Sequence, residues 1–200
     1  SHNKVTCFSF DGIKNITCGE GGGVVAFDGN VISKIKDMRL LGVKKDTEQR
    51  YAGARSWEFD VELQGYRYHM SNINAAIGLA QLSRIEEFQI NRQRIVKKYL
   101  QSFNKIENVK VLSLDYSNII SHIFVILVDN RDKLRHYLLE KNIEVGVHYK
   151  PNHLLSKFSS AYSLPNTESL YEQILTLPIH NDLTDEEQTY IIDSIYEFYK

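Results

Sequence analysis

The pattern of apolar and polar residues predicts two neighbouring β-strands and a helix at the start of the chain. Residues 5–10 and 23–27 are short runs rich in β-branched and aromatic side chains, and a glycine-rich segment separates them. Apolar residues recur at helical spacing over residues 30–41. Asn30 is the expected N-cap of this helix and Gly42 its expected end.

Residues 43–70 mix charges, aromatics and glycines without a sustained period. A segment this long without secondary structure is usually a functional loop. Ser71 then predicts the start of a helix with an apolar stripe, and the helical pattern continues in a more charged form to about Phe103.

The second half of the chain has the pattern of a small α+β domain. Thr184 and Glu187 form a capping-box pattern before a final helix with an apolar stripe. The other expected elements are strands at 109–112, 119–128 and 143–149 and a helix at 131–141. We therefore expect two domains, residues 1–90 and 91–200.

Composition excludes several classes of protein. The 200 residues are 42% hydrophobic and 24% charged, as in ordinary globular chains, and the net charge is −1. The basic residues are scattered, so no nucleic-acid-binding face is expected. No apolar run approaches the length of a membrane span, residues 1–4 do not have the pattern of a signal peptide, and the only cysteines are Cys7 and Cys18. We expect a cytoplasmic protein that contacts neither membrane nor nucleic acid.

Lys14 is the first candidate for chemistry, because it lies between a predicted strand and the glycine run 19–23. A lysine amine can form a Schiff base and move protons, and Ser9 at the strand end is placed to bind phosphate. The lysine precedes the glycines, which excludes a nucleotide-binding P-loop. By chemistry alone, a lysine in this position is more often a surface lysine beside a turn than a catalytic residue.

A family resemblance decides between these readings. Phe8-Ser9-Phe10 followed by Lys14-Asn15 and Gly19-Glu20-Gly21-Gly22 resembles the lysine motif of the DegT/DnrJ/EryC1/StrS sugar aminotransferases. The resemblance implies that Lys14 binds pyridoxal 5'-phosphate as a Schiff base and that Ser9 binds the cofactor phosphate. It implies no metal.

Three further stretches resemble the same family in the same order, at 65–78, 146–153 and 177–184. The first departs from the family pattern, because Arg67 replaces an asparagine that often reaches the phosphate across a dimer. Arg67 is expected to serve the same anion as a charged donor. Tyr66 and His69, from the same stretch, are expected to contact substrate.

The stretch 146–153 resembles a loop that borders the nucleotide-sugar pocket. Tyr149 and His153 are therefore expected to hydrogen-bond substrate, although a loop held by aromatic packing remains the alternative. His148 and His153 are not expected to bind metal, because no acidic or thiol ligand accompanies them. His180 is expected to be structural.

The resemblance implies an α/β, fold-type-I architecture like that of aspartate aminotransferase. Residues 1–90 would be the closing part of the cofactor-binding large domain, and residues 91–200 the small C-terminal domain. No residue before Lys14 resembles the family's aromatic that stacks on the pyridine ring or its acidic residue that faces the ring nitrogen. We expect an upstream segment to supply them.

The implied function is amino transfer from glutamate to a nucleotide-linked, dTDP 4-keto-6-deoxy sugar, by a homodimer with shared active sites. The product would serve surface polysaccharide such as lipopolysaccharide O-antigen. Alternatives are a 3-keto-sugar aminotransferase, an inactive truncated fragment, or a dehydratase of the same family. Lys14 argues against the dehydratase, which has histidine at that position.

Overall fold

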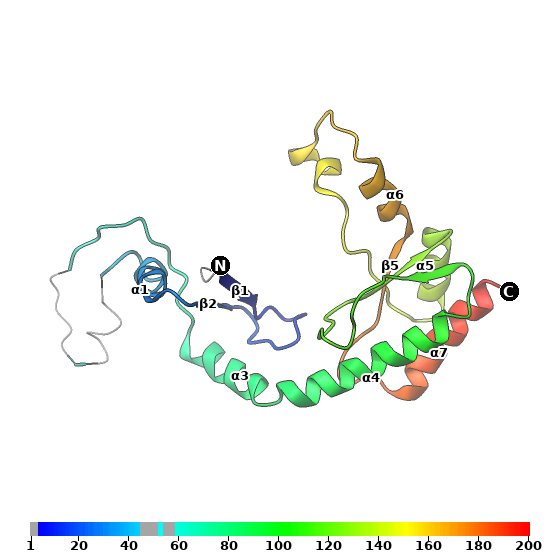
Figure 1. Ribbon diagram of the computed structural model, residues 1–200, viewed down its shortest axis with the longest axis horizontal. Helices are drawn as coiled ribbons and strands as arrows, with labels where there is room; N and C mark the ends of the chain where they lie inside the picture. The colour runs from blue at the N-terminus through cyan, green and yellow to red at the C-terminus, as the bar shows by residue number, and fades with distance from the viewer. Residues whose placement is uncertain (1–3, 45–51, 54–58) are drawn as a thin grey trace. The chain divides into compact units, whose positions relative to one another are not determined.

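The computed structural model describes residues 4–44, 52–53 and 59–200. The chain divides into two compact units, Ser1–Ile85 and Glu86–Lys200. The division falls just before the boundary expected from the sequence, after residue 90. The units are described separately below (Figure 1).

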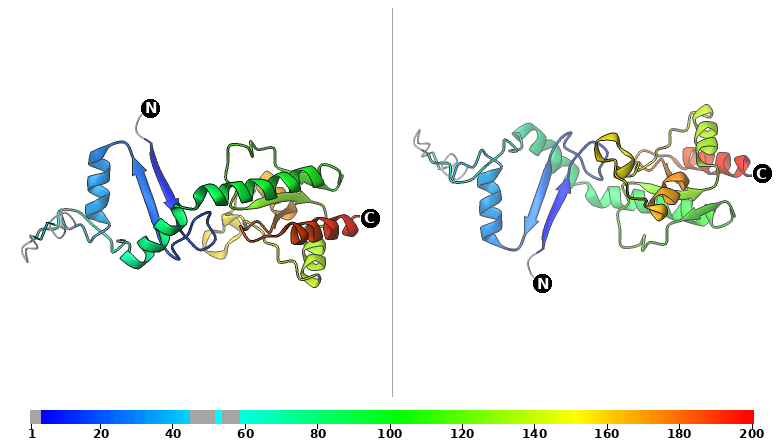
Figure 2. Two further views of the ribbon diagram at one scale, coloured as in Figure 1. Left: turned by 90° about the horizontal axis from the view of Figure 1, so that it is seen from below. Right: turned by 90° about the horizontal axis from the view of Figure 1, so that it is seen from above.

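A two-stranded antiparallel ribbon opens unit 1, as the sequence predicted. Strand β1, Val5–Ser9, pairs with β2, Gly22–Ala26, and Ser9 lies opposite Gly22 at the end of the ribbon. The strands are neighbouring arrows in both views of Figure 2. A Cβ added to Gly22 would lie 2.7 Å from the Phe8 carbonyl oxygen, so glycine permits this close pairing.

Helix α1, Gly29–Met38, follows β2, but its cap differs from the expected one. Asp28, not Asn30, is the N-cap, because the Asp28 Oδ1 accepts a hydrogen bond from the Asn30 N–H at 2.8 Å. After the helix, Gly42 adopts a φ of +77°, which ends the segment as the sequence predicted.

Helix α3, Asn72–Leu82, begins at the expected cap, Ser71, but it is shorter than predicted. The expected continuous helix to Phe103 is wrong, because α3 ends at Leu82, with Ser83 as its C-cap, and α4 begins at Ile85. The Ser83 hydroxyl donates to the Ala80 carbonyl at 2.8 Å, a local bond that competes with helix propagation.

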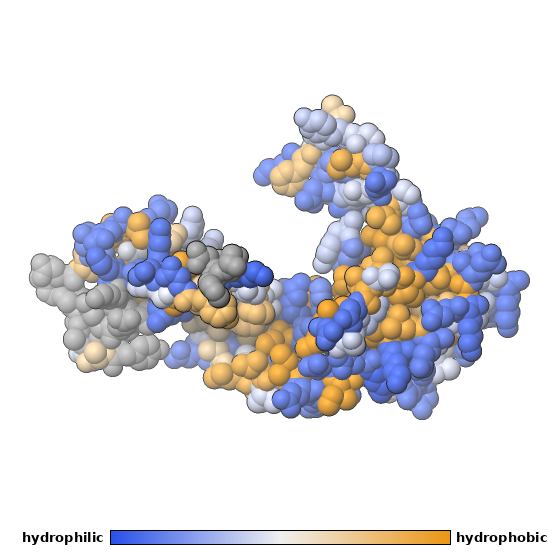
Figure 3. All heavy atoms as spheres, viewed as in Figure 1, coloured by the Kyte–Doolittle hydropathy of each residue, from blue (hydrophilic) through white to orange (hydrophobic). Residues whose placement is uncertain are grey.

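Unit 1 has an apolar surface rather than a core. Among its described residues only Cys18 and Gly42 are buried. Helix α3 leaves Ile73 75% exposed and Leu79 68% exposed, and apolar spheres gather over this helix in Figure 3. Contiguous apolar surface of this kind marks an interaction site in a soluble protein.

Unit 2 contains a three-stranded antiparallel sheet with the order β3-β4-β5. Its strands are Val109–Val111, Phe124–Val128 and Ile174–Leu177. The sequence predicted the first and the closing part of the second, but it missed β5. The strand expected at 143–149 is absent, since that segment joins the sheet only through the bridge between Gly146 and Thr176.

The helices of unit 2 surround a continuous hydrophobic core. Tyr99, Phe124, Leu134, Leu175 and Ile195, from five different elements, are each at most 1% exposed. The helices are α4 Ile85–Phe103, α5 Arg131–Glu140, α6 Pro165–Gln173 and α7 Asp185–Phe198, with 3-10 turns at Asn152–Leu154 and Ser156–Phe158. Within the described part of the chain, no helix combines the length and apolar character that a bilayer crossing requires.

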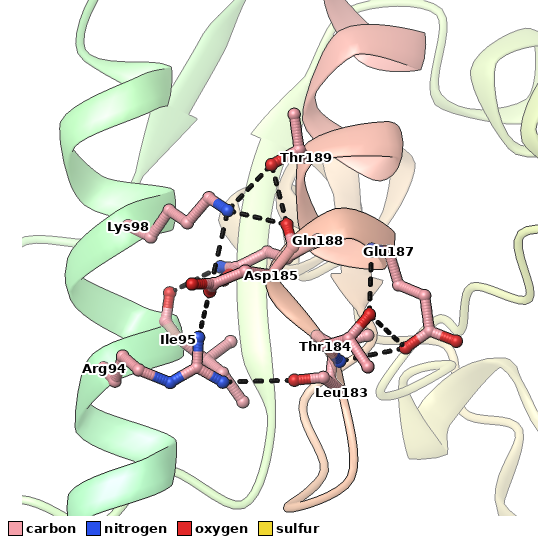
Figure 4. Close-up of polar contacts among 9 residues, drawn as sticks. All are labelled: Arg94, Ile95, Lys98, Leu183, Thr184, Asp185, Glu187, Gln188 and Thr189. Atoms are coloured by element: carbon pink, nitrogen blue, oxygen red, sulfur yellow. Dashed lines mark hydrogen bonds and ion pairs between the residues drawn. The ribbon is translucent and has the colours of Figure 1, made fainter.

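Polar contacts join α4 to the start of α7 (Figure 4). The buried Gln188 donates from Nε2 to the Ile95 carbonyl at 2.7 Å. Lys98 Nζ donates to the Asp185 carbonyl at 2.8 Å, and Arg94 pairs with the Asp185 carboxylate. These bonds fix the register of two helices whose apolar faces share the core.

The predicted capping box of α7 is confirmed. Thr184 Oγ1 accepts from the Glu187 N–H at 3.1 Å, and the Glu187 carboxylate accepts from the Thr184 N–H at 2.9 Å. Two N–H groups that the first turn would otherwise leave without partners are satisfied in this way.

Removing this cap should destabilise the protein. We expect Thr184→Ala to lower the free energy of unfolding by about 1 kcal/mol, because the Glu187 N–H loses its acceptor. Urea denaturation followed by circular dichroism measures the change. Thr184→Ser keeps the hydroxyl and should stay near wild type; equal losses in both variants would contradict the capping role.

Candidate active site

Lys14 lies in a loop that is closed at its base by backbone hydrogen bonds. The loop leaves β1 after Ser9. The Phe10 N–H donates to the Gly21 carbonyl at 2.9 Å, and the Phe10 carbonyl accepts from the Cys18 N–H at 3.0 Å. Both polar groups of one residue therefore hold the two ends of the loop together, and Lys14 is presented from within it.

The side chains at the base of this loop fit a carbonyl cofactor that carries a phosphate. Lys14 is half-buried, and no other described residue engages its Nζ. The exposed Ser9 accepts from the Asp11 N–H at 3.4 Å through Oγ, which leaves its hydroxyl hydrogen free to donate to an anion. A primary amine and a free hydroxyl donor are among the groups that a pyridoxal phosphate site needs.

The glycine run after Lys14 allows a close approach between two segments. Gly19 and Gly21 have φ values of +81° and +157°. A Cβ at Gly21 would lie 2.7 Å from the Met70 side chain and 2.8 Å from Cys18 Sγ. Glycine is therefore required where the lysine loop meets the segment that leads into α3.

The segment with the predicted residues Tyr66, Arg67 and His69 runs extended beside the end of α1. The Tyr66 N–H donates to the Met38 carbonyl at 2.7 Å, and Arg67 forms a β-bridge with Leu40. The rings of Tyr66 and Tyr68 stack with centroids 5.1 Å apart. The side chains of Tyr66, Arg67 and His69 are exposed.

One cavity joins this segment to the glycine run. It measures about 530 Å³, and its lining comprises Glu20, Gly21, Gly22, Tyr68, His69, Met70, Ser71 and Asn74. The structure therefore brings His69 to the loop of Lys14, whereas Tyr66 and Arg67 are not part of the lining. A second, apolar hollow of about 400 Å³ contains Phe10, Ile16 and Thr17, which belong to the same loop as Lys14.

The two other predicted substrate residues belong to unit 2. Tyr149 is 63% exposed, and its ring meets that of His148 edge-on at 4.7 Å. His153 Nε2 lies 3.0 Å from Glu168 Oε1. A carboxylate accepts hydrogen bonds, so Nε2 carries the proton and a neutral His153 offers Nδ1 as an acceptor to a substrate hydroxyl.

Each histidine of this loop has a protein partner. His148 Nδ1 lies 2.9 Å from Thr176 Oγ1, in strand β5. Across the described residues, no three His, Cys, Asp or Glu side chains gather as a metal site. Glu168 was not predicted from the sequence, because its pairing with His153 depends on how α6 folds back on the loop.

Comparison with known proteins identifies the family. Residues 1–196 match the DegT/DnrJ/EryC1/StrS aminotransferase family. The chain belongs to this family. An uncharacterised protein of Methanocaldococcus jannaschii is 32% identical over 202 residues, which cover 95% of this chain and 52% of that protein. The chain thus spans about half the length of the curated relative.

Solved structures show the same fold. A protein of Streptococcus pneumoniae described as a sugar aminotransferase, in its PMP form, is 29% identical with a TM-score of 0.83, over 95% of this chain and 51% of that one. PseC of Helicobacter pylori, an aminotransferase in pseudoaminic acid biosynthesis, is 26% identical with a TM-score of 0.85, over 98% and 53%. The predicted α/β fold of pyridoxal-phosphate-dependent sugar aminotransferases is confirmed.

The pairing of His153 with Glu168 makes a testable prediction. The Leu164 N–H, followed by the His153 ring, holds the pKa of the Glu168 carboxyl below its ordinary value. A depressed carboxyl pKa contributes stability that is present above the unfolded pKa and is lost as pH falls through the folded pKa. His153→Ala should raise the Glu168 pKa part of the way to its ordinary value. The variant should therefore lose less stability than the wild type when the pH is lowered.

Carbon-detected NMR titration of the Glu168 carboxyl measures the shift. His136→Ala, which removes an exposed histidine paired with Glu140, is the matched control. An unchanged Glu168 pKa in the His153 variant would show that the ring does not interact with the carboxylate in solution.

Proposed function

We propose that the whole protein is a pyridoxal-phosphate-dependent aminotransferase that acts on a nucleotide-linked keto-sugar. The observation that carries the proposal is the closed loop of Lys14, with its amine unengaged by described residues and with Ser9 at the adjoining strand end. Aminotransferases of this family use this cofactor, and the chain matches the family over residues 1–196.

In this proposal Lys14 has two tasks. Its Nζ would hold the cofactor at its aldehyde carbon, and its amine would carry the proton that the substrate carbon loses or gains in each half of the reaction. Bound pyridoxal phosphate supplies the electron sink that stabilises negative charge at the carbon that loses its proton. Ser9 donates its hydroxyl hydrogen to the phosphate and so fixes the distance to Lys14.

The proposed reaction converts glutamate and a dTDP-linked 4-keto-6-deoxy sugar into 2-oxoglutarate and the 4-amino sugar, and it needs no other reactant. The similar proteins of S. pneumoniae and H. pylori, one described as a sugar aminotransferase and the other active in pseudoaminic acid biosynthesis, favour a sugar acceptor. Tyr66, His69, Tyr149 and His153 are proposed to contact it. The product would serve surface polysaccharide such as O-antigen.

A homodimer in the cytoplasm completes the proposal. The exposed apolar residues of α3 support an assembled protein, because such a surface is unfavourable in water. Arg67 is exposed on a segment fixed by backbone bonds, so its guanidinium is available to an anion of a second subunit. Cys7 and Cys18 are free thiols, as a reducing compartment maintains them.

Covalent binding at Lys14 tests the proposal directly. Reduction with borohydride after addition of pyridoxal phosphate should leave the cofactor on the peptide that contains Lys14. Lys14→Arg should abolish this adduct and the glutamate-dependent amination, because a guanidinium does not form the bond. Lys36→Arg, at an exposed helix position, should retain both.

Assay with 4-keto and 3-keto dTDP sugars distinguishes the proposed substrate from its isomer. Preferred turnover of the 3-keto sugar would replace the 4-keto assignment. An adduct that forms on another lysine, or full activity in Lys14→Arg, would refute the function proposed for the loop.

The proposed anion contact of Arg67 is tested separately. Arg67→Ala should weaken retention of pyridoxal phosphate about tenfold, the size expected for one lost hydrogen bond to a charged group. Arg67→Asn restores an amide donor and should recover part of the affinity. Equilibrium dialysis measures retention, with Arg135→Ala on α5 as the control; equal affinity in all four proteins would contradict the contact.

A further inference from the structure

Asn74, in the first turn of α3, connects this helix to the loop of Lys14. We propose that Asn74 is a positioning residue that holds the Lys14 loop in place by binding the Glu20 carbonyl. This inference rests on the function proposed above for Lys14. Asn74 lies 60 residues after Lys14 in the sequence, and both residues belong to unit 1.

Both ends of the Asn74 amide are engaged. Nδ2 donates to the Glu20 carbonyl oxygen at 2.9 Å, and Oδ1 accepts from the Ser71 hydroxyl at 2.7 Å. The Asn74 N–H in turn donates to Ser71 Oγ at 3.1 Å. A carbonyl oxygen only accepts, so the orientation of the amide is determined by its partners. The cap of α3 and the link to the loop form one network.

The Glu20 carbonyl is the point where this network reaches the lysine loop. It also accepts a hydrogen bond from Cys18 Sγ at 3.3 Å. Glu20 lies between Gly19 and Gly21, which have positive φ values and lack the Cβ that restricts other residues. The Asn74 donor therefore ties the residue between these two glycines to α3.

Loss of the anchor reaches Lys14 through the base of the loop. Cys18 and Gly21, on either side of the Glu20 anchor, make the two backbone bonds to Phe10 that close the loop. Movement of Glu20 therefore loosens both bonds at once. The amine of Lys14 would then sample a wider range of positions relative to Ser9.

Packing against α3 provides a second tie at the same place. A Cβ built at Gly78 would lie 3.5 Å from the Cys18 Cβ, which is ordinary contact, and the Met70 side chain covers Gly21. These apolar contacts hold α3 close to the loop, but they do not determine how the Glu20 carbonyl is oriented. The hydrogen bond from Asn74 orients this carbonyl, because the strength of a hydrogen bond depends on its angle.

The test compares a variant that loses the bond to Glu20 with variants that keep it. Asn74→Leu removes the donor to Glu20 and the acceptor for Ser71, while its backbone N–H still reaches Ser71 Oγ. Ser71→Ala loses the bonds between Ser71 and Asn74 but keeps the Asn74 donor to Glu20. Asn74→Gln retains an amide and is the conservative rescue.

Two readouts are taken on the whole protein. Hydrogen–deuterium exchange without added cofactor reports on the amides of peptide 10–21. We expect Asn74→Leu to exchange about tenfold faster there, since one hydrogen bond of ordinary net strength is lost. The rate and pH profile of adduct formation at Lys14, trapped with borohydride, should slow about tenfold in the same variant. Asn74→Gln should recover most of both.

Ser71→Ala should change both readouts less than about threefold, because the Glu20 bond persists while only the cap is weakened. Equal effects in Ser71→Ala and Asn74→Leu would reduce Asn74 to a helix-capping role and overturn the proposal. Wild-type exchange in Asn74→Leu would overturn it as well. If the wild-type protein forms no adduct at Lys14, the proposed function and the positioning role are both contradicted. The exchange rate of Asn74→Leu relative to wild type still shows separately whether the bond from Asn74 to the Glu20 carbonyl holds the loop.

Discussion

The closure of one loop on the two backbone groups of Phe10 is the constraint on which the candidate site depends. The N–H of this residue binds the Gly21 carbonyl, and its carbonyl binds the Cys18 N–H. Side chains of the loop add to this closure, since Thr17 Oγ1 donates to the Phe10 carbonyl at 3.1 Å and Asp11 Oδ1 accepts from the Ile13 N–H at 3.1 Å. The Nζ of Lys14 takes no part in these bonds with described residues.

The two units reach order by different means. Unit 2 has a hydrophobic core drawn from its sheet and helices, with polar bonds between α4 and α7 that set the register. Unit 1 buries little among its described residues, and it is ordered by backbone hydrogen bonds, close glycine contacts and the Asn74 link. Hydrogen bonds exposed to water contribute little net stability. The candidate site thus lies in the unit that buries fewer of its described apolar residues.

The sequence predicted those features that local chemistry determines. The capping residues Ser71 and Thr184 were identified because a cap bonds only to its own helix. The strand pair around the Lys14 loop followed from apolar runs that bracket glycines. Strand β5 and the single bridge at Gly146 were missed, because both depend on pairing with distant residues. The partners of His153 and Asn74 were missed for the same reason.

The family resemblance assigned functions to residues for which no local pattern predicts one, but it did not show which contacts hold those residues in place. It marked Lys14 and Ser9, and the structure then showed that Lys14 belongs to a loop closed by Phe10 and that Ser9 ends the strand before it. It also covered the stretch with Asn74, to which it gave no role. In the sequence, an asparagine in the first turn of a helix indicates only a weak helix former, because its side chain prefers to bond to nearby backbone groups. Only the geometry shows that this amide donates to the Glu20 carbonyl, 54 residues earlier, and so connects the helix to the loop that carries the lysine.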